Sequence, residues 1–513
     1  MTIRARLTGL LLAGAAGCSA PAPPAPFDVV EASIAELGAA MDEGRITSEQ
    51  LVERYLARIE AYDEQGPALN TIIALNPGAL ATARALDTER LETGPRGPLH
   101  GVPMLIKDNY DMAGLPTTNG SLAMADVRPP DDAFQVRRLR EAGAVILGKT
   151  NLHEFARGIT TVSSLGGQTL NPYDTTRNPG GSSGGTAAAV AASFAAAGMG
   201  SDTCGSIRIP SAHNSLVGLR GTSGLSSRDG VVPLSETLDI AGPLARTVTD
   251  LALVLDATVG SDPADPSTAE ADANIPTSYM AALDADALRG ARVGVLTMLT
   301  RQDPADEPVA RVIDAAVDDL GRLGTEVVTV EIDGLADLLD SYTVLSHEFK
   351  FSLNTYLEEI PGAPSLADVL ADGRYHPDVE ERLRRSNEVE TLDTEVYREA
   401  LGRRETIRRR VVETLDELEL DALIYPTIRQ QAAVIGRPQG GDNCRLSPHS
   451  GLPAITVPAG FTPDELPVGL EMLGRPFAEA RLIGLAYAFE QATSHRRPPP
   501  STPALPALVP ADP

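Results

Sequence analysis

Lysine is scarce in this chain, and one lysine is placed where it could act as a base. Only Lys107, Lys149 and Lys350 occur among 513 residues, beside 40 arginines. Lys107 ends an apolar stretch that starts at Gly101. Burial lowers the pKa of a lysine, whereas arginine stays charged, so a buried Lys107 could supply a neutral amine. The alternative is a structural ion pair with Asp108 or another carboxylate.

A glycine- and serine-rich run, Gly-Gly-Ser-Ser-Gly-Gly, occupies residues 180–185. It leads into the alanine-rich segment 186–198, which predicts a buried helix with free backbone amides in its first turn. A flexible linker does not normally enter a buried helix, and a phosphate-binding loop needs a lysine where Thr186 stands. The run also fits G-x-S-x-G, with Ser182 as the nucleophile of a hydrolase elbow. That motif needs a preceding strand, and residues 171–179 hold two prolines instead.

A second cluster, Gly-Ser-Asp-Thr-Cys-Gly-Ser, occupies residues 200–206. With it, the chain resembles the amidase signature family, whose hallmark is such a Gly/Ser-rich block with a Ser-cisSer-Lys triad. The resemblance runs from about residue 30 to 495. Further stretches that carry it are 101–109, 148–155, 451–458 and 466–475. It implies hydrolysis of carboxylic amides through an acyl-enzyme, and the segment 347–357 resembles exported, peptide-amidase-like members.

The resemblance assigns a role to each residue of the two clusters. By position, Ser206 is the nucleophile, Ser182 the bridging serine held on a cis peptide, and Lys107 the terminal base. The backbone amides expected in the oxyanion hole are those of Thr203, Cys204, Gly205 and Ser206. The positions expected to support the loop are Gly181, Ser183, Asp202 and Arg208. These roles suit the chemistry, because a serine hydroxyl needs a base and a tetrahedral oxyanion needs amide donors.

Cys204 departs from the family pattern, which usually has a glycine at this position. A side chain there restricts the backbone. A thiol nucleophile at Cys204 is an alternative, but no histidine lies nearby in the sequence. The three cysteines, Cys18, Cys204 and Cys444, do not indicate a disulfide framework.

Helical and strand patterns alternate along the chain and predict the fold. A capping box at 47–50 opens an amphipathic helix, and the helix 131–142 leads into a short apolar strand at 144–147. The same alternation of strands and helices is expected over 291–332, 397–425 and 468–492. Helices that alternate with strands are typical of an α/β sheet. We therefore expect a single large α/β/α domain with a mixed central sheet flanked by helices.

The N-terminus has the pattern of an export signal. Arg4 and Arg6 precede an apolar run that is too short to cross a membrane, and Ala-Ala-Gly-Cys at 15–18 resembles a lipobox with Ala15 replacing the usual leucine. The expected organisation is a signal peptide (1–17), Cys18 as a lipidated first residue, a Pro/Ala-rich tether (18–28), the amidase domain (29–495) and a Pro-rich tail (496–513). The protein would then be periplasmic or an outer-membrane lipoprotein, anchored only through its lipid.

Composition limits the partners. The formal charge of −27 argues against nucleic acid and against a basic membrane-binding surface. The seven histidines show no metal-ligand spacing, and neither a metal nor a cofactor is expected. A small-molecule amide or short peptide is the expected substrate, with esters and carbamates as further substrates. Two alternatives are a tRNA-dependent amidotransferase A-type subunit and a catalytically inactive binding protein.

Overall fold

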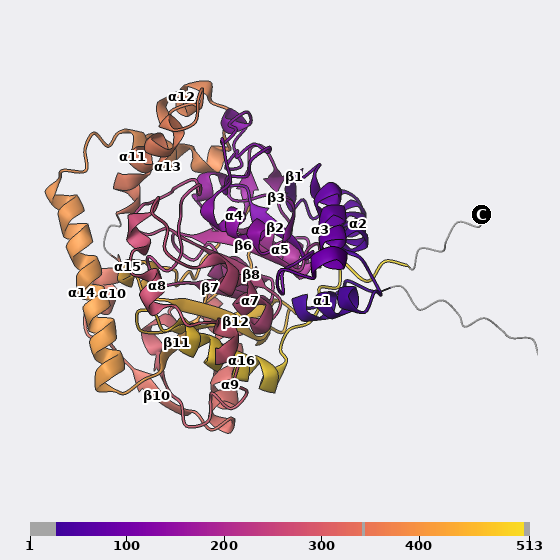
Figure 1. Ribbon diagram of the computed structural model, residues 1–513. Helices are drawn as coiled ribbons and strands as arrows, with labels where there is room; N and C mark the ends of the chain where they lie inside the picture. The colour runs from indigo at the N-terminus through magenta and orange to yellow at the C-terminus, as the bar shows by residue number, and fades with distance from the viewer. Residues whose placement is uncertain (1–26, 341–343, 507–513) are drawn as a thin grey trace, which may run out of the picture.

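The computed structural model describes residues 27–340 and 344–506 (Figure 1). The expected signal peptide, Cys18 and most of the expected tether lie outside the described residues, and so does the end of the expected tail. Among the described helices, none combines the length and apolar character that a membrane span requires.

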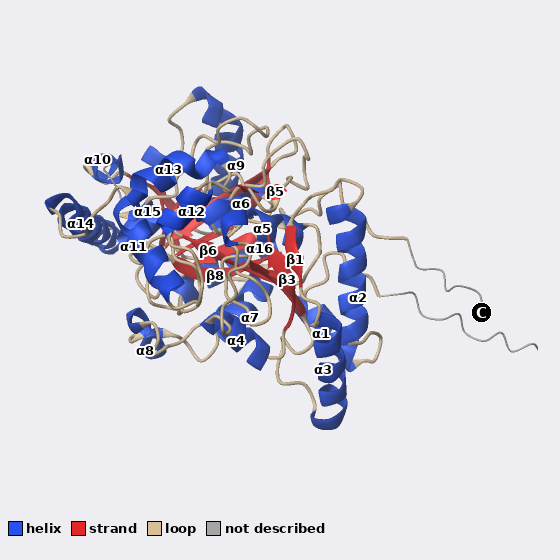
Figure 2. Cartoon of the chain, turned by 90° about the horizontal axis from the view of Figure 1, so that it is seen from above, coloured by secondary structure: helices blue, strands red, loops and turns tan. Residues whose placement is uncertain are grey.

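A mixed sheet of eleven strands forms the centre of the described chain (Figures 1 and 2). In spatial order, its strands are β1 (Ile72–Leu75), β3 (Val145–Thr150), β2 (Pro103–Lys107), β6 (Ala197–Asp202), β8 (Ile240–Ala245), β7 (Val217–Arg220), β12 (Ala454–Phe461), β13 (Pro467–Leu473), β11 (Ala422–Pro426), β9 (Arg292–Leu296) and β10 (Glu326–Val330). Strands β3, β2 and β6 run parallel, as do β11, β9 and β10, and the other neighbours are antiparallel. The expected α/β fold with a mixed sheet is confirmed.

Helices flank this sheet. The α-helices of the described residues are α1 (Ile34–Asp42), α2 (Ser48–Ile59), α3 (Ala79–Thr93), α4 (Phe134–Glu141), α5 (Gly184–Ala191), α6 (Arg208–His213), α7 (Val248–Thr258), α8 (Ala271–Asn274), α9 (Glu307–Arg322), α10 (Leu335–Asp340), α11 (Leu345–Glu358), α12 (Leu366–Asp372), α13 (Pro377–Asn387), α14 (Glu395–Glu417), α15 (Leu446–Ser450) and α16 (Glu479–Thr493). The predicted capping box is present, because Thr47 and Gln50 each accept a hydrogen bond from the other's backbone amide.

Side-chain alternation along the strands separates the apolar cores. In β11, Ile424 joins the largest core, to which α2, α3, α7, α9 and α16 contribute. Its neighbours Leu423 and Tyr425 join a second core, under α14. Successive side chains of a strand point to opposite faces, so the sheet is buried on both sides. The short helices α5 and α6 also contribute to two smaller apolar clusters, α5 to one and α6 to the other.

A helical group lies beside the sheet, at the upper left of Figure 1. It consists of α11, α12 and α13, whose apolar side chains form one cluster with Met124, Phe155 and Val232. The rings of Phe155 and Phe349 meet edge to face, with centroids 6.2 Å apart. This cluster attaches the helical group to the loop that follows β3, which contains part of the candidate site.

The predicted helix over 186–198 is wrong in its second half. Helix α5 ends at Ala191, and Ala197–Asp202 is the buried strand β6. Gly198 of β6 occupies a crowded position, because a Cβ there would lie 2.4 Å from Thr186 Cγ2. A strand that is buried on both faces shows no polar alternation, and this explains the error.

The first part of the expected Pro-rich tail packs against the domain. Arg496 pairs with Glu31 at 2.7 Å, and Arg58 donates hydrogen bonds to the carbonyl groups of Thr502 and Pro503. Residues 496–506 therefore join the two ends of the described chain.

Candidate active site

The sheet brings the predicted base and the second glycine-rich cluster to one edge. Lys107 ends β2 and Asp202 ends β6, and these two strands are parallel neighbours with Ile106 opposite Met199. Because the carboxyl ends of parallel strands meet at the same edge of a sheet, Lys107 lies beside the loop 202–206. Ligand sites of α/β sheets commonly form at this edge.

Lys107 is buried and contacts two serines. Its Nζ lies 2.7 Å from Ser182 Oγ and 2.8 Å from Ser201 Oγ, and Asn109 also donates a hydrogen bond to Ser201 Oγ. Burial lowers the pKa of Lys107 to about 7. The carboxylates of Asp239 and Asp202 act in the opposite direction, because they stabilise the charged amine. A substantial fraction of the amine is therefore neutral near pH 7.

The structural ion pair considered for Lys107 is formed by a different lysine. Asp108 Oδ1 lies 3.1 Å from Nζ of Lys149, and both side chains are fully buried. Asp108 also accepts a hydrogen bond from the hydroxyl of Thr118. This arrangement leaves Lys107 directed at Ser182.

Ser182 follows a cis peptide bond, Gly181–Ser182, as the family resemblance implies. Its carbonyl accepts a hydrogen bond from the amide of His153 at 3.0 Å. Close packing explains the glycine before it, because a Cβ at Gly181 would lie 2.9 Å from the carbonyl carbon of Ile159. The loop 180–183 precedes α5 and follows a segment without a long strand, so the elbow context for a Ser182 nucleophile is absent here.

Ser206 lies in the loop between β6 and α6, next to Ser183. The Ser183 amide donates to the Ser206 carbonyl at 3.1 Å, and the Ser183 hydroxyl donates to the carbonyl of Ser201 at 3.2 Å. The two glycine-rich clusters are therefore held together, with Lys107 beneath them.

Three of the four expected oxyanion-hole amides are free to bind a ligand. The amides of Thr203, Cys204 and Ser206 have no hydrogen-bond partner among the described residues. The expectation for Gly205 needs correction, since its amide donates to Asp202 Oδ1 at 2.7 Å. The Asp202 carboxylate thus uses one of the four expected amides and leaves the other three without a hydrogen-bond partner among the described residues.

A cavity of about 940 Å³ opens over this loop. Thr203, Cys204 and Ser206 contribute to its wall, whereas Lys107 and Ser182 lie below its surface. Its charged lining residues are Arg157, Arg382, Arg437, Arg445, Asp378 and Asp442. Arginines outnumber carboxylates in this lining, although the whole chain carries a charge of −27.

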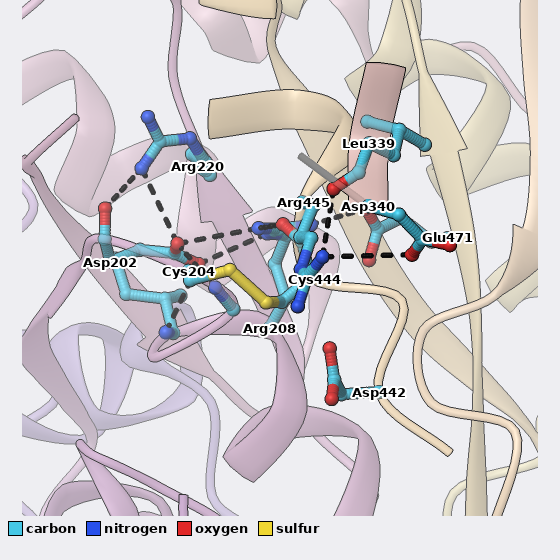
Figure 3. The surroundings of a disulfide bond; sticks show 12 residues. Asp202, Cys204, Arg208, Arg220, Leu339, Asp340, Asp442, Cys444, Arg445 and Glu471 are labelled. Atoms are coloured by element: carbon cyan, nitrogen blue, oxygen red, sulfur yellow. Dashed lines mark hydrogen bonds and ion pairs between the residues drawn. A yellow bond between two sulfur atoms is a disulfide. The ribbon is translucent and has the colours of Figure 1, made fainter. Parts of the chain in front are cut away.

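A disulfide joins Cys204 to Cys444, which lies 240 residues further along the chain (Figure 3). Both cysteines line the cavity. Cys204 therefore has no thiol in this structure, which removes the alternative of a thiol nucleophile. No sequence signal indicated this pairing, because the three cysteines show no framework spacing.

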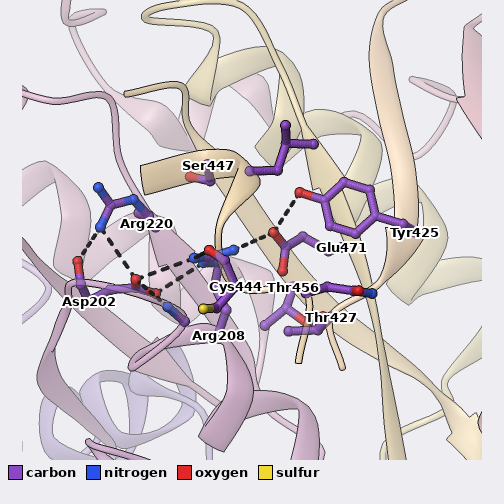
Figure 4. A network of polar contacts seen from close by, with 12 residues as sticks. Asp202, Arg208, Arg220, Tyr425, Thr427, Cys444, Ser447, Thr456 and Glu471 are labelled. Atoms are coloured by element: carbon purple, nitrogen blue, oxygen red, sulfur yellow. Dashed lines mark hydrogen bonds and ion pairs between the residues drawn. The ribbon is translucent and has the colours of Figure 1, made fainter. Parts of the chain in front are cut away.

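A buried network of charges supports the loop from behind (Figure 4). Arg208 pairs with Asp202 at 3.0 Å and with Glu471, which also accepts a hydrogen bond from Tyr425 at 2.9 Å. Burial opposes the charge of Asp202, but Arg208 and Arg220 outweigh it and hold the pKa of Asp202 well below its usual range. The network thus connects the loop to β13 and β11 and keeps Asp202 ionised.

Sequence reasoning missed Ser201, Asn109 and Cys444. Ser201 accepts hydrogen bonds from Lys107 and from Asn109, so it gives the lysine amine a second contact besides Ser182. Ser201 and Asn109 both lie inside stretches that carried the resemblance to the amidase signature family. Their contacts could have been expected only once β2 and β6 were paired in register.

The comparisons with known proteins agree with this geometry. The family model described as Amidase matches residues 50–483. The native peptide amidase of Stenotrophomonas maltophilia, a solved structure, superposes with a TM-score of 0.84 at 41% identity over 91% of this chain and 98% of that one. The chain belongs to the amidase signature family, which is an enzyme family of carbon–nitrogen hydrolases.

Two curated relatives cover almost the whole chain. A probable amidase of Arabidopsis thaliana is 37% identical over 493 residues, which is 92% of each chain. The A-type subunit of the glutamyl-tRNA(Gln) amidotransferase of Moorella thermoacetica is 39% identical over 484 residues, 90% of this chain and 97% of the relative.

Proposed function

We propose that this protein is an amidase that hydrolyses carboxylic amides through Ser206, Ser182 and Lys107. The observation that carries the proposal is the buried Lys107 amine, 2.7 Å from the hydroxyl of Ser182 on the cis peptide. In the loop beside them, Ser206 reaches the cavity and three backbone amides are free. A base, a relay hydroxyl, a nucleophile and oxyanion donors are the parts that acyl transfer requires.

Each step moves one proton along the triad. Neutral Lys107 takes a proton from the hydroxyl of Ser182, and Ser182 takes a proton from the hydroxyl of Ser206. At the same time, Ser206 Oγ attacks the amide carbonyl carbon. The oxyanion of the tetrahedral intermediate is stabilised by the amides of Thr203, Cys204 and Ser206. The relay then runs in reverse and protonates the departing nitrogen, which leaves an acyl-enzyme. Water, activated by the same relay, releases the acid.

The proposed substrates are C-terminal amides of short peptides, with aryl or alkyl amides as further members of the class. A cavity of about 940 Å³ accommodates a peptide of a few residues. Similarity to the peptide amidase supports this choice, and that enzyme was solved in complex with the competitive inhibitor chymostatin. Esters and carbamates would use the same oxyanion hole.

The amidotransferase relatives favour a second candidate, an A-type subunit that acts with partner chains. A catalytically inactive binding protein is a third. Turnover of a peptide amide by the isolated chain separates the first proposal from both alternatives.

We also propose that the chain is exported and carries lipid on Cys18. The proposal rests on Arg4, Arg6 and the apolar run before the cysteine. The Cys204–Cys444 disulfide supports it, because disulfides persist in oxidising compartments such as the periplasm.

The first test is labelling of the purified protein with a fluorophosphonate, followed by intact mass and peptide mapping. A fluorophosphonate phosphonylates an activated serine, so we expect one adduct, on Ser206, and release of ammonia from peptide amides by the unlabelled protein. An adduct on Ser182 would support the elbow mechanism instead. Absence of both an adduct and turnover would contradict the proposal and favour the binding protein.

The pH dependence of kcat/KM should follow Lys107. Because burial lowers the pKa of Lys107 to about 7, the amine is protonated and inactive below this pH and neutral above it. We expect kcat/KM for a peptide amide to rise with pH, reach half its maximum near pH 7 and level off above about pH 8.

His153 and His376 line the cavity, and a control must show that the pH profile does not come from either of them. Burial lowers the pKa of His153 to about 3, outside the relevant range. The control for the other histidine is His376→Gln, which should keep the same profile. A rate that is highest at pH 5, or a midpoint that moves in His376→Gln, would contradict the role of Lys107.

A further inference from the structure

Hydrogen bonds restrain most residues of the loop 202–206, but not the backbone of Cys204. At one end, Asp202 accepts hydrogen bonds from the amides of Gly205 at 2.7 Å and Ile207 at 3.2 Å. Before Cys204, the hydroxyl of Thr203 donates to Asp239. Neither the amide nor the carbonyl of Cys204 has a hydrogen-bond partner among the described residues. The free amide is useful in an oxyanion hole, but it leaves the peptide without a backbone restraint.

The disulfide supplies a restraint at this residue. Cys204 and Cys444 have Cα atoms 4.9 Å apart (Figure 3). The bond also covers Gly205, where a Cβ would lie 2.9 Å from Cys444 Cβ. Gly205 has φ +82°, a conformation that glycine adopts readily, so the loop makes its turn directly under the disulfide.

Cys444 is itself firmly anchored. Its carbonyl accepts a hydrogen bond from Arg208 at 3.2 Å, and the side chain of the preceding Asn443 donates to the carbonyl of Pro426 at 2.7 Å. Cys444 is 7% exposed and packs with Ile209 and Ile428. The Cys444 end of the disulfide is thus fixed to Arg208 of the charged network and to the end of β11. The Cys204 end restrains the loop 202–206.

We infer that Cys444 is a positioning residue, which acts through the disulfide to hold the Cys204 amide in the oxyanion hole. The inference rests on the proposed function. A donor stabilises the transition state only if it is already in place, and misplacement by about 1 Å can cost about 100-fold in rate. The disulfide therefore contributes to the chemical step, and the oxidation state of the pair sets the activity.

The test compares the oxidised and reduced forms of the full chain. Dithiothreitol supplies two electrons and two protons, forms its own cyclic disulfide and leaves Cys204 and Cys444 as two thiols. Alkylation and peptide mapping verify the reduction. For a peptide amide, we expect kcat to fall about tenfold with KM changed less than about twofold, and reoxidation to restore kcat.

Variants separate this role from a general effect of the reductant. Cys444→Ser should have the low kcat of the reduced protein and should not respond to dithiothreitol. Cys204→Ser and the double variant should match it, because the two cysteines act as one unit. All forms are compared at a temperature where circular dichroism shows each of them folded. The rate of fluorophosphonate labelling should fall in parallel with kcat, since the adduct also uses the oxyanion hole.

The outcomes are distinct. An unchanged kcat in fully reduced protein would overturn the inference, and so would a rise of KM alone, which would mean that the disulfide only shapes the cavity. If the oxidised protein neither hydrolyses amides nor labels on Ser206, the proposed function itself fails.

Discussion

Replacement of Ser206 by alanine should lower kcat for a peptide amide by about 10⁶-fold, because removal of a catalytic nucleophile in a serine enzyme costs a factor of this order. The variant keeps the free amides of the loop, so KM should change little. Ammonia release, measured against the uncatalysed rate, gives the size of the loss. Fluorophosphonate labelling should disappear at the same time.

Ser211→Ala is the matched control for this variant. Ser211 is also buried, five residues further along, and its hydroxyl donates to the carbonyl of Ile207, the N-cap residue of its helix, at 2.8 Å. Loss of this hydroxyl should leave kcat within about twofold, since a hydrogen bond of this kind contributes about 1 kcal/mol to stability and Ser211 does not line the cavity. A fully active Ser206→Ala would contradict the proposed mechanism.

The triad should also behave as a unit. Lys107→Ala alone should lose most of the activity, and its addition to Ser206→Ala should cost little more, because residues that act in one relay are strongly non-additive. Additive losses would indicate that Lys107 acts outside the relay, as a structural cation below the loop.

The sequence was informative about the fold wherever the signal was local. Helix α2 could be placed from the Thr47 capping box, and helix–strand alternation predicted the α/β class. Strand β6 was missed, because most residues of Ala197–Asp202 are small, show no alternation and continue an alanine-rich run. Its burial on both faces is a property of the assembled sheet, and no local pattern reports it.

The difference between local sequence signals and long-range packing also applies to the candidate site. Glycine-rich clusters and a lysine at the end of an apolar run pointed to Lys107, Ser182 and Ser206. The contact of Lys107 with Ser201 depends on strand register, and the Cys204–Cys444 bond joins residues 240 apart. The use of the Gly205 amide by Asp202 depends on the turn of the loop. These features come from long-range packing, so they could not be predicted from local sequence patterns.

Replacement of Arg208 by methionine should destabilise the fold by about 3–5 kcal/mol, which is typical when one partner of a buried ion pair is removed. Arg208 is fully buried and contacts Asp202 and Glu471, so the variant leaves two carboxylates in the interior with fewer partners. Chemical denaturation monitored by circular dichroism would measure the loss. Arg289→Met is the control. Its pair with Asp286 is exposed, and its removal should cost less than about 0.5 kcal/mol.

The pH at which acid unfolds the protein provides a second test of the Arg208→Met variant. The pKa of Asp202 is lowered in the folded state, since Arg208 and Arg220 outweigh the burial of its carboxyl group. Its stabilising contribution is therefore present above the unfolded-state pKa and is lost as the pH falls through the folded-state value. Without Arg208 the folded-state pKa of Asp202 rises, so acid unfolding should begin at a higher pH than in the wild type.

The same variant should lose activity at neutral pH, where it is still folded. Asp202 accepts hydrogen bonds from the amides of Gly205 and Ile207, so kcat of Arg208→Met should fall when Asp202 loses its arginine partner. A variant with wild-type stability and an unchanged acid transition would show that Arg208 is not what keeps Asp202 ionised.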